Sequence, residues 1–333
     1  MKLRIGVIGQ GRDWQSRYLP ALRSMRDRLQ VVSVYNSVSL LADAAARELD
    51  AERYDSFRAV MESPALDAVL VLEDDWYRLM PLFAACDYGK AVFCGADLNL
   101  DPAAAAKIHN QVQSAGVAFM TEFPRRFAPA TLRLKELIAT RLGRPRLLFC
   151  HRRLACESKD RTRTLDARSQ RELMELIDWC NYIVADAPTW IQAIRHTSSQ
   201  TPENSDYQIL SLGFGNPEKD PQAILAQISC GAYIPEVWNE AIAYRPPAAI
   251  QVCCEKGLAF VDLPTTLVWF DDAGRHQETL DTELSVGQQM LGQFHRSITS
   301  LVRKSNDLED TCRALHILDQ AKKSTESFSR VAI

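Results

Sequence analysis

Short apolar runs alternate with helical stretches over the first 123 residues of the chain. The predicted strands are residues 3–8, 31–36, 67–74, 91–95 and 117–123. The predicted helices are residues 14–28 and 40–51, one that ends at residues 88–89, and 102–116. Continuous apolar runs of this length are typical of strands buried on both faces. Because strands alternate with helices, the pattern predicts βαβ units and a parallel, doubly wound sheet with helices on both faces.

The pattern of predicted helices and strands changes after residue 123. Helices are predicted at 129–142, at about 165–185, at about 283–304, and from 308 into the 320s. Between them lie strand-like runs at 189–197, 207–214, 223–233, 248–263 and 265–272. Gly, Pro and Asp turns join these runs with few helices between, which indicates a mostly antiparallel sheet. The expected fold class is α/β, with a parallel doubly wound domain at 1–123 and an α+β domain at 124–333.

A glycine loop follows the first predicted strand. Gly9 allows a tight turn, and Gly11 lets the backbone approach a pyrophosphate at the start of the next helix. This strand-loop-helix order predicts a Rossmann domain that binds NAD or NADP, and the alternative is such a domain that has lost its nucleotide. Trp14 stands where the motif has its third glycine, so either the helix is displaced or the indole points outward toward the ligand. The candidate loop residues are Gly9, Gln10, Gly11, Arg12, Asp13 and Trp14.

The second predicted strand ends on neutral residues. An acid usually stands there and bonds the ribose hydroxyls of the cofactor. This chain has Asn36 followed by Ser37, which lacks both the charge that repels a 2′-phosphate and an adjacent arginine that attracts one. Asn36 and Ser37 are candidate cofactor-binding residues, and the choice between NAD and NADP stays open.

Composition narrows the classes of partner. The net charge is −3, which gives no electrostatic case for nucleic acid or an anionic membrane. No apolar stretch approaches the roughly 20 residues of a membrane helix, and the N-terminal apolar run is too short for a signal peptide. The nine cysteines are scattered with no C-x-x-C pair, which is typical of reduced thiols rather than a zinc site. We expect a cytoplasmic protein without a metal.

The chain resembles the glucose–fructose oxidoreductase / inositol dehydrogenase (Gfo/Idh/MocA) family over nearly its whole length. The segments that carry the resemblance are residues 5–22, 67–94, 122–129, 175–184 and 308–321. The resemblance implies an NAD(P)-dependent oxidoreductase that acts on a sugar, a polyol or a related small molecule. It also places Glu73 and Asp74, at the end of the third predicted strand, near the cofactor.

Departures from the family pattern fall on the residues that the family uses for chemistry. The family's Glu-Lys-Pro after the fourth strand is Gly95-Ala96-Asp97 here, so its lysine is missing. The family's helical aspartate and histidine correspond to Arg171 and Glu175, whereas a later aspartate is retained as Asp178. These changes leave a second hypothesis open, in which the protein is a non-catalytic binding or regulatory protein that keeps the fold.

Two acids are the candidate catalytic residues. Glu175 and Asp178 are three residues apart, so on a helix they share one face and could divide acid and base roles. Glu175 could act as a base if burial raised its pKa. The alternative is that both acids belong to a solvated or salt-bridged helix face.

Basic residues gather in the first part of the second domain. Residues 125–171 hold fourteen Lys or Arg against four Asp or Glu. Most charge runs are solvated faces. Arg125 and Arg126, however, directly follow the last strand of the parallel sheet, whose carboxyl edge borders the ligand crevice in such folds. Together with His151 they are candidate substrate-binding residues, suited to an anionic small molecule.

The runs at 248–263 and 265–272 are apolar on both alternating faces. One face can pack on helices of the domain, which leaves the other in need of cover. We therefore expect a homo-oligomer, a dimer or a tetramer, joined through this sheet. The family resemblance points the same way. The alternative is that helices of the same chain cover both faces.

Overall fold

Two β-sheets organise the protein in the structure, which is a computed structural model. The structure describes residues 1–73, 77–95, 102–156, 162–197, 205–215, 220, 223–235, 238, 240–300 and 307–333. By their contacts these residues divide into two units. The first unit comprises Met1–Pro124 and Leu284–Cys312, and the second comprises Arg125–Glu283 and Arg313–Ile333.

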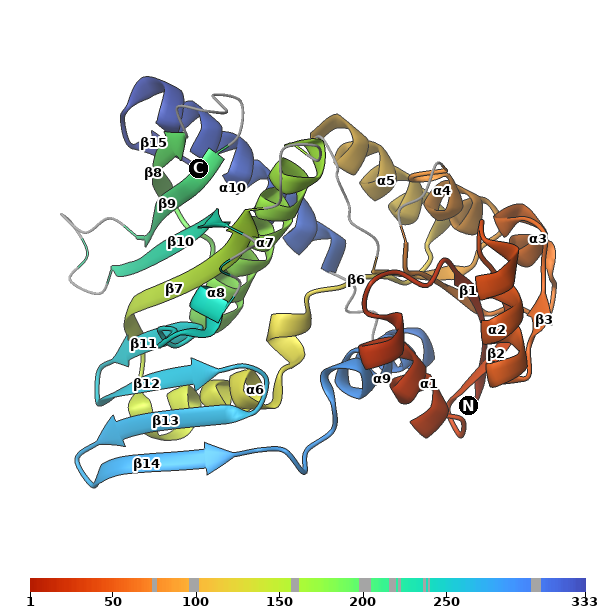
Figure 1. Ribbon diagram of the computed structural model, residues 1–333, viewed down its shortest axis with the longest axis horizontal. Coiled ribbons are helices and arrows are strands. Elements are labelled where there is room, and N and C mark those ends of the chain that lie inside the picture. Colours follow the sequence, from red (N-terminus) through yellow and green to blue (C-terminus); the bar gives the residue numbers. More distant parts are fainter. Residues whose placement is uncertain are drawn as a thin grey trace. The chain divides into compact units, whose positions relative to one another are not determined.

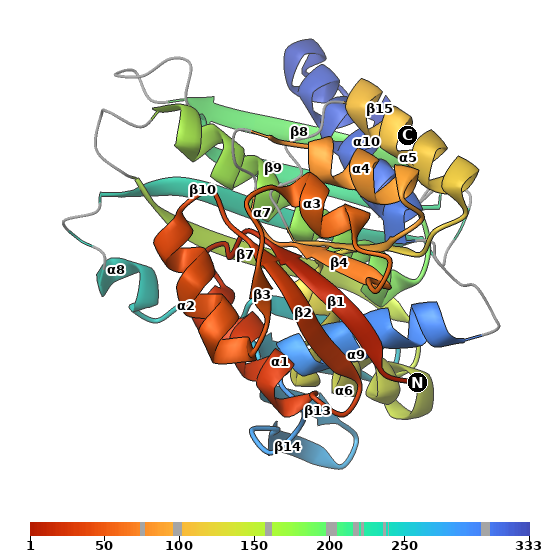
Figure 2. The ribbon, with the colours of Figure 1, turned by 90° about the vertical axis from the view of Figure 1, so that its right-hand side faces the viewer.

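The first unit is built on a parallel six-stranded sheet in the order β3-β2-β1-β4-β5-β6 (Figures 1 and 2). Every position of β4 and β5 is buried, as expected for strands that helices cover on both sides. The strands are β1 (Leu3–Ile8), β2 (Leu29–Tyr35), β3 (Glu52–Arg53), β4 (Ala68–Val71), β5 (Ala91–Cys94) and β6 (Phe119–Thr121).

Helices cover both faces of this sheet. They are η1 (Trp14–Tyr18), α1 (Leu19–Ser24), α2 (Ser39–Leu49), α3 (Phe57–Glu62), α4 (Met80–Asp87), α5 (Pro102–Ala115) and α9 (Val286–Thr299). Helices α3, α4 and α5 follow one another on one face, whereas α1 packs against α9 on the other (Figure 1). The parallel, doubly wound sheet predicted from the sequence is therefore confirmed. Helix α9, from the C-terminal part of the chain, packs in this unit.

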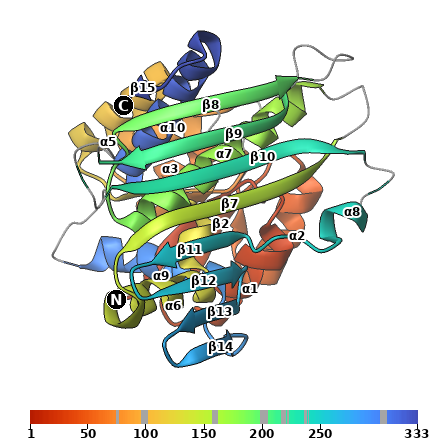
Figure 3. The ribbon, with the colours of Figure 1, turned by 90° about the vertical axis from the view of Figure 1, so that its left-hand side faces the viewer.

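The second unit contains a nine-stranded sheet in the order β14-β13-β12-β11-β7-β10-β9-β8-β15 (Figure 3). The pairing of β7 with β10 is parallel and the other recorded pairings are antiparallel. This confirms the expected mostly antiparallel sheet. The strands are β7 (Pro145–Cys156), β8 (Trp190–Thr197), β9 (Ser205–Phe214), β10 (Ile224–Pro235), β11 (Ile250–Cys254), β12 (Gly257–Asp262), β13 (Thr266–Asp271), β14 (Gly274–Thr279) and β15 (Val331–Ala332).

One face of this sheet is covered by helices of its own unit. The remaining helices are η2 (Pro124–Phe127), α6 (Pro129–Leu137), η3 (Ile138–Leu142), α7 (Thr162–Val184), α8 (Glu240–Ala243) and α10 (Asp307–Ser327). Helix α7 packs on β7 and β10, and α6 packs on β12 and β13. Along β7, Leu148 and Cys150 are buried on that side, whereas Leu147 and Phe149 point the other way and are 39% and 38% exposed.

Several elements differ from their sequence-based expectation, and β7, β14 and α3 were not predicted at all. The run 248–263 is not one strand but the hairpin of β11 and β12, which turns at Glu255 and Lys256. The short edge strand β3 was not predicted, because Glu52 and Arg53 are exposed and carry no apolar pattern. The first helix ends at Ser24 rather than near residue 28, and it begins with the π-helical turn η1.

Candidate functional site

The glycine loop after β1 lies against the end of β4. Gly9 and Gly11 both adopt left-handed backbone angles, with φ of 71° and 59°. A Cβ on Gly9 would lie 2.4 Å from Glu73 Cβ, and one on Gly11 would lie 2.2 Å from the carbonyl oxygen of Leu72. Glycine is therefore required at both positions by backbone conformation and by space.

Three successive backbone amides of this loop form no hydrogen bond within the described part of the chain. They belong to Gly11, Arg12 and Asp13. The side chain of Arg12 is exposed beside them and has no recorded partner among those residues. Adjacent free N–H groups followed by a helix bind phosphate oxygens. The loop thus fits the pyrophosphate of a dinucleotide.

Trp14 is accommodated by the way the helix begins. Its side chain is 4% exposed. The amides of Arg17 and Tyr18 both donate to the carbonyl of Asp13, at 2.9 and 3.3 Å, which gives the wide first turn of η1. Of the two arrangements left open by the sequence, the structure favours a changed helix start over an outward-facing indole.

The predicted ribose-binding residue Asn36 is buried at the end of β2 and bonds on two sides. Its Oδ1 accepts from the amide of Val38 at 2.8 Å, and its Nδ2 donates to Glu73 Oε2 at 3.4 Å. The backbone amide of Gln10 donates to the same Glu73 oxygen at 3.2 Å. The structure therefore brings Gln10, Asn36 and Glu73 together, while Ser37 is exposed beside them. Asp74 lies outside the described residues.

A buried ion pair at the carboxyl end of β5 and β6 was missed by the sequence analysis. Arg17 binds Glu122, whose side chain is 4% exposed, and it also binds Asp13 at 3.1 Å. A side chain at Gly95 would begin 2.8 Å from Tyr18 Oη and 3.1 Å from Glu122 Oε2. Burial, followed by the charge of Glu122, raises the pKa of Tyr18.

Two sequence signals could have revealed this pair. Asp13 and Arg17 are spaced i, i+4, and Glu122 is an acid at the end of a buried strand. Ala96 and Asp97 lie outside the described residues.

A network of buried charges joins η2 to α7 in the second unit. Arg125 binds Glu175 and donates to Glu172 at 2.6 Å. Arg126 holds both oxygens of Asp178, whose side chain is 2% exposed. The structure thus brings the two predicted substrate-binding arginines together with the two predicted catalytic acids.

Helical spacing places the acids of this network on one face of α7. Arg171 donates to Glu175 at 3.1 Å from the preceding turn, and Arg152 of β7 lies 3.4 Å from Glu172. Burial acts to raise the pKa of Glu172, but the charges of Arg125 and Arg152 outweigh it and hold that pKa below its usual value. In the structure these acids thus lie on a salt-bridged helix face, which was the alternative considered from the sequence.

His151 lies apart from this network. Side chains alternate along β7, and Arg152 reaches Glu172 of α7, so His151 points to the opposite face of the sheet from α7. There His151 Nδ1 lies 2.7 Å from Ser229 Oγ. Burial and the charge of Arg153 lower the pKa of His151.

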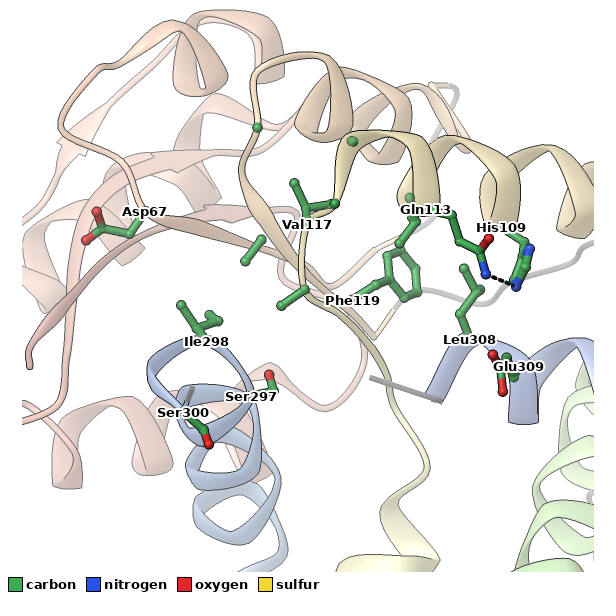
Figure 4. Close-up of a pocket in the computed structure, with 16 residues that line it drawn as sticks. Asp67, His109, Gln113, Val117, Phe119, Ser297, Ile298, Ser300, Leu308 and Glu309 are labelled. Carbon is green, nitrogen blue, oxygen red and sulfur yellow. Dashed lines mark hydrogen bonds between the residues drawn. The ribbon is translucent and has the colours of Figure 1, made fainter. Parts of the chain in front are cut away.

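A pocket of about 390 Å³ lies at the other end of the first unit's sheet (Figure 4). It is lined at the amino ends of β4, β5 and β6 by Asp67, Ala91 and Phe119, and by Ile298 and Leu308 from the C-terminal part of the chain. Ligands of open α/β sheets bind at the carboxyl ends of the strands. The glycine loop, not this pocket, is therefore the candidate cofactor site.

Over the described ranges no group of three or more His, Cys, Asp or Glu side chains could hold a metal ion. None of the described helices is long and apolar enough to cross a membrane.

Comparisons with known proteins agree with the geometry of the first unit. Residues 3–123 match the family model GFO_IDH_MocA, described as an oxidoreductase family with an NAD-binding Rossmann fold. A D-xylose 1-dehydrogenase (NADP(+)) of Haloferax volcanii is 29% identical over 147 residues, which are 42% of this chain and 43% of that protein. The match thus spans less than half of that relative.

Two longer matches cover more of the chain. An inositol 2-dehydrogenase of Streptomyces avermitilis is 24% identical over 282 residues, 83% of this chain and 77% of that protein. The crystal structure of an aldose-aldose oxidoreductase from Caulobacter crescentus, complexed with glycerol, covers both chains fully with a TM-score of 0.83 at 15% identity, a likeness of fold. Over residues 3–123 the chain is thus similar to the Gfo/Idh/MocA oxidoreductase family with its NAD-binding Rossmann fold.

Proposed function

We propose that the protein is an NAD(P)-dependent oxidoreductase that acts on a sugar, a polyol or a related, anionic small molecule. The observation that carries this proposal is the loop at residues 9–14, which combines two required glycines with three free amides. Relatives named for D-xylose and inositol support the substrate class. The bound nicotinamide would supply or accept the hydride.

The residues of this chain would hold the reactants and move the proton. Gly11, Arg12 and Asp13 would bind the pyrophosphate through their amides, with the Arg12 side chain adding positive charge. Glu175 is the proposed acceptor of the substrate hydroxyl proton, because each of its oxygens has one recorded arginine contact and room for a second hydrogen bond. Asp178, bound by Arg126, would fix the face of α7 that presents Glu175.

Arginine chemistry favours an anionic substrate. Among the described residues, the ion pairs around α7 involve the guanidinium groups of Arg125, Arg126, Arg152 and Arg171. Arg152 is the most exposed of them, at 45%. A carboxylate or phosphate on the substrate would pair with the exposed Arg152 guanidinium.

We expect ordinary polyols to react slowly or not at all. This expectation comes from the family resemblance, in which Ala96 corresponds to a lysine and Glu175 to a histidine. Loss of one general acid or base costs on the order of 10²–10⁴-fold in rate. Charge from Arg125 and Arg126 replaces the lysine's positive charge only if the substrate reaches them.

A second candidate function is supported by the ion pairs themselves. Glu175 contacts Arg125 and Arg171, and Asp178 is held by Arg126 through both oxygens. Carboxylates held in this way are suited to fixing the fold and poorly suited to taking a proton. In this alternative the protein binds a dinucleotide or another ligand without turnover.

We also propose that a second copy covers the open face of the nine-stranded sheet, which Figure 3 shows toward the viewer. Leu147 and Leu225 are cross-strand partners on this face, and Leu147 also pairs with Cys253 of β11. Leu147, Phe149, Leu225 and Phe270 are each 37–40% exposed. A contiguous apolar sheet face usually marks an interface, and two-fold pairing is its simplest closed form.

Turnover of a substrate panel separates the two candidate functions. Nicotinamide absorbance would be followed with NAD⁺ and NADP⁺ against polyols, sugars, sugar acids and sugar phosphates. We expect slow turnover that is strongest with anionic substrates and falls about 10²–10⁴-fold in Glu175→Gln. The control Glu326→Gln changes an exposed acid of α10 and should behave as wild type.

Each outcome decides between the proposals. Dinucleotide binding without turnover of any substrate would favour the non-catalytic alternative. Fast turnover of inositol or glucose would contradict the expected slow reaction. Full activity in Glu175→Gln would remove Glu175 from the mechanism.

A further inference from the structure

We propose that Glu73, and not a residue of β2, is the acid that binds the adenosine ribose and selects NAD over NADP. This inference rests on the proposed dinucleotide binding and deepens it. Rossmann domains that bind NAD usually place a carboxylate at the end of the second strand, where it bonds the ribose hydroxyls. Here that position is Asn36, so the strand itself supplies no charge.

The Glu73 side chain reaches across the end of β1 to the end of β2, where the usual carboxylate is missing. It follows β4, whereas Asn36 follows β2, and β1 lies between these two strands. The glycine at the end of β1 makes the crossing possible, because a Cβ on Gly9 would lie 2.4 Å from Glu73 Cβ and 3.2 Å from Glu73 Oε2. Gly9 thus leaves room for the Glu73 side chain and also permits the turn of the loop.

The Glu73 carboxylate is held at this point by two neutral donors. Its Oε2 accepts from the Gln10 amide at 3.2 Å and from Asn36 Nδ2 at 3.4 Å. Asn36 is oriented in turn, because its Oδ1 accepts from the amide of Val38. Neither donor carries a charge, so the position keeps the full negative charge of Glu73.

The second oxygen of Glu73 remains open to a ligand. Within the ranges that the structure describes, no contact is recorded for Oε1. Glu73 is half-buried, so a hydroxyl group can reach it. A carboxylate oxygen in this state accepts hydrogen bonds from a ribose diol and repels a 2′-phosphate.

An apolar surface adjoins the proposed ribose site. Val38, Leu40 and Leu41 are 51%, 72% and 46% exposed at the start of α2. The side chain of Gln10 donates to the carbonyl of Leu41 at 2.8 Å, which ties this surface to the glycine loop. An adenine ring beside the ribose would cover part of these side chains.

Calorimetric titration of the full chain tests the assignment by binding rather than by activity. The ligands are NAD⁺ and NADP⁺, together with ADP-ribose and its 2′-phosphate. We expect wild type to bind NAD⁺ more tightly than NADP⁺ by roughly 10- to 100-fold, the size of one like-charge contact near a protein surface. Glu73→Gln should bring the ratio near one, mainly by improved NADP⁺ binding.

Three variants separate charge from structure. Glu73→Asp keeps the charge and should keep most of the discrimination, even if the shorter side chain weakens its hydrogen bonds. The double variant Glu73→Gln/Asn36→Asp moves the charge to β2 and should restore the preference for NAD⁺. Glu62→Gln removes an acid that bonds Tyr88 Oη elsewhere in the same unit and should leave the ratio unchanged.

The outcomes separate this inference from the proposed function. Equal binding of NAD⁺ and NADP⁺ by wild type, or an unchanged ratio in Glu73→Gln, would overturn the role of Glu73 while leaving dinucleotide binding intact. If wild type binds none of the four ligands, the proposed function fails, and the inference fails with it.

Discussion

Asp178 illustrates how much one residue of the α7 network depends on its partner. Its side chain is 2% exposed and both of its oxygens bind Arg126. Asp178→Asn would leave a buried guanidinium without its carboxylate, which typically costs about 3–5 kcal/mol. We therefore expect a large loss in the free energy of unfolding, measured by urea titration.

The control for this prediction is an exposed pair in the same unit. Asp319 and Lys323 are spaced i, i+4 on α10, at 2.9 Å. Asp319→Asn should cost less than about 1 kcal/mol. Equal losses in the free energy of unfolding of the two variants would contradict a large contribution from the buried pair of Arg126 and Asp178.

Glu172 gives the network a defined pH dependence. Burial acts to raise its pKa, but the charges of Arg125 and Arg152 hold it below the usual value of 4.5. A carboxyl with a lowered folded-state pKa adds stability above its unfolded pKa and loses it as pH falls through the folded one. Stability should therefore fall below about pH 4.5.

Urea midpoints measured from pH 7 downward would check this for wild type and Glu172→Gln. The variant should be less stable at neutral pH and should show a shallower acid loss. An identical pH profile in the two proteins would contradict the contribution of Glu172.

At the residue scale the sequence identified members of the site but not their contacts. Glycine loop residues could be predicted because strand, turn and helix signals are adjacent in the chain. The pairing of Arg126 with Asp178 joins residues 52 positions apart, and that of Asn36 with Glu73 joins residues 37 positions apart. Such contacts depend on which strands and helices become neighbours, which local patterns do not encode.

Helix α9 shows at the scale of an element how glycine permits close packing. A Cβ on Gly287 would lie 2.6 Å from the carbonyl oxygen of Arg17 and 3.1 Å from Ala21 Cβ. One on Gly292, in the same helix, would meet only Met25 Cε, at 3.9 Å. Gly287 therefore sets the distance between α9 and the helix that follows the glycine loop.

Replacing each of the two glycines by alanine should change the free energy of unfolding in opposite directions. Gly287→Ala overpacks the contact and should destabilise the protein by about 1–3 kcal/mol. Gly292→Ala removes a helix-interior glycine without a clash and should stabilise it by up to about 1 kcal/mol. Urea unfolding of both variants checks the prediction, and destabilisation of similar size in both would contradict it.

Elements were predictable where apolar runs are long and were lost where the pattern is weak. The buried strands β4 and β5 stand out because every residue in them is apolar. Residues 248–263 read as one run because Glu255 and Lys256 interrupt the apolar pattern only briefly. In the structure these two residues form the turn, with their amides bound to the carbonyls of Arg144 and Leu142.

At the scale of the whole molecule, the open sheet face predicts self-association. Light scattering at micromolar concentration should give a dimer or a larger closed assembly rather than the 37.5 kDa monomer. Phe149→Glu should dissociate it by burying a charge in the apolar interface. Leu284→Glu, which changes an exposed apolar residue of the first unit, should leave the assembly intact. A monomeric wild type would contradict this prediction.

Dinucleotide binding at the loop 9–14 is the central claim, and an NADH titration followed by nicotinamide fluorescence tests it most directly. Wild type should show saturable binding at one site per chain. Arg12→Glu, which changes an exposed side chain and leaves the backbone free to fold, should weaken binding about tenfold or more by placing a carboxylate beside the pyrophosphate. Saturable binding that Arg12→Glu weakens would support the account, whereas folded wild-type protein that binds neither NADH nor NADPH would contradict it.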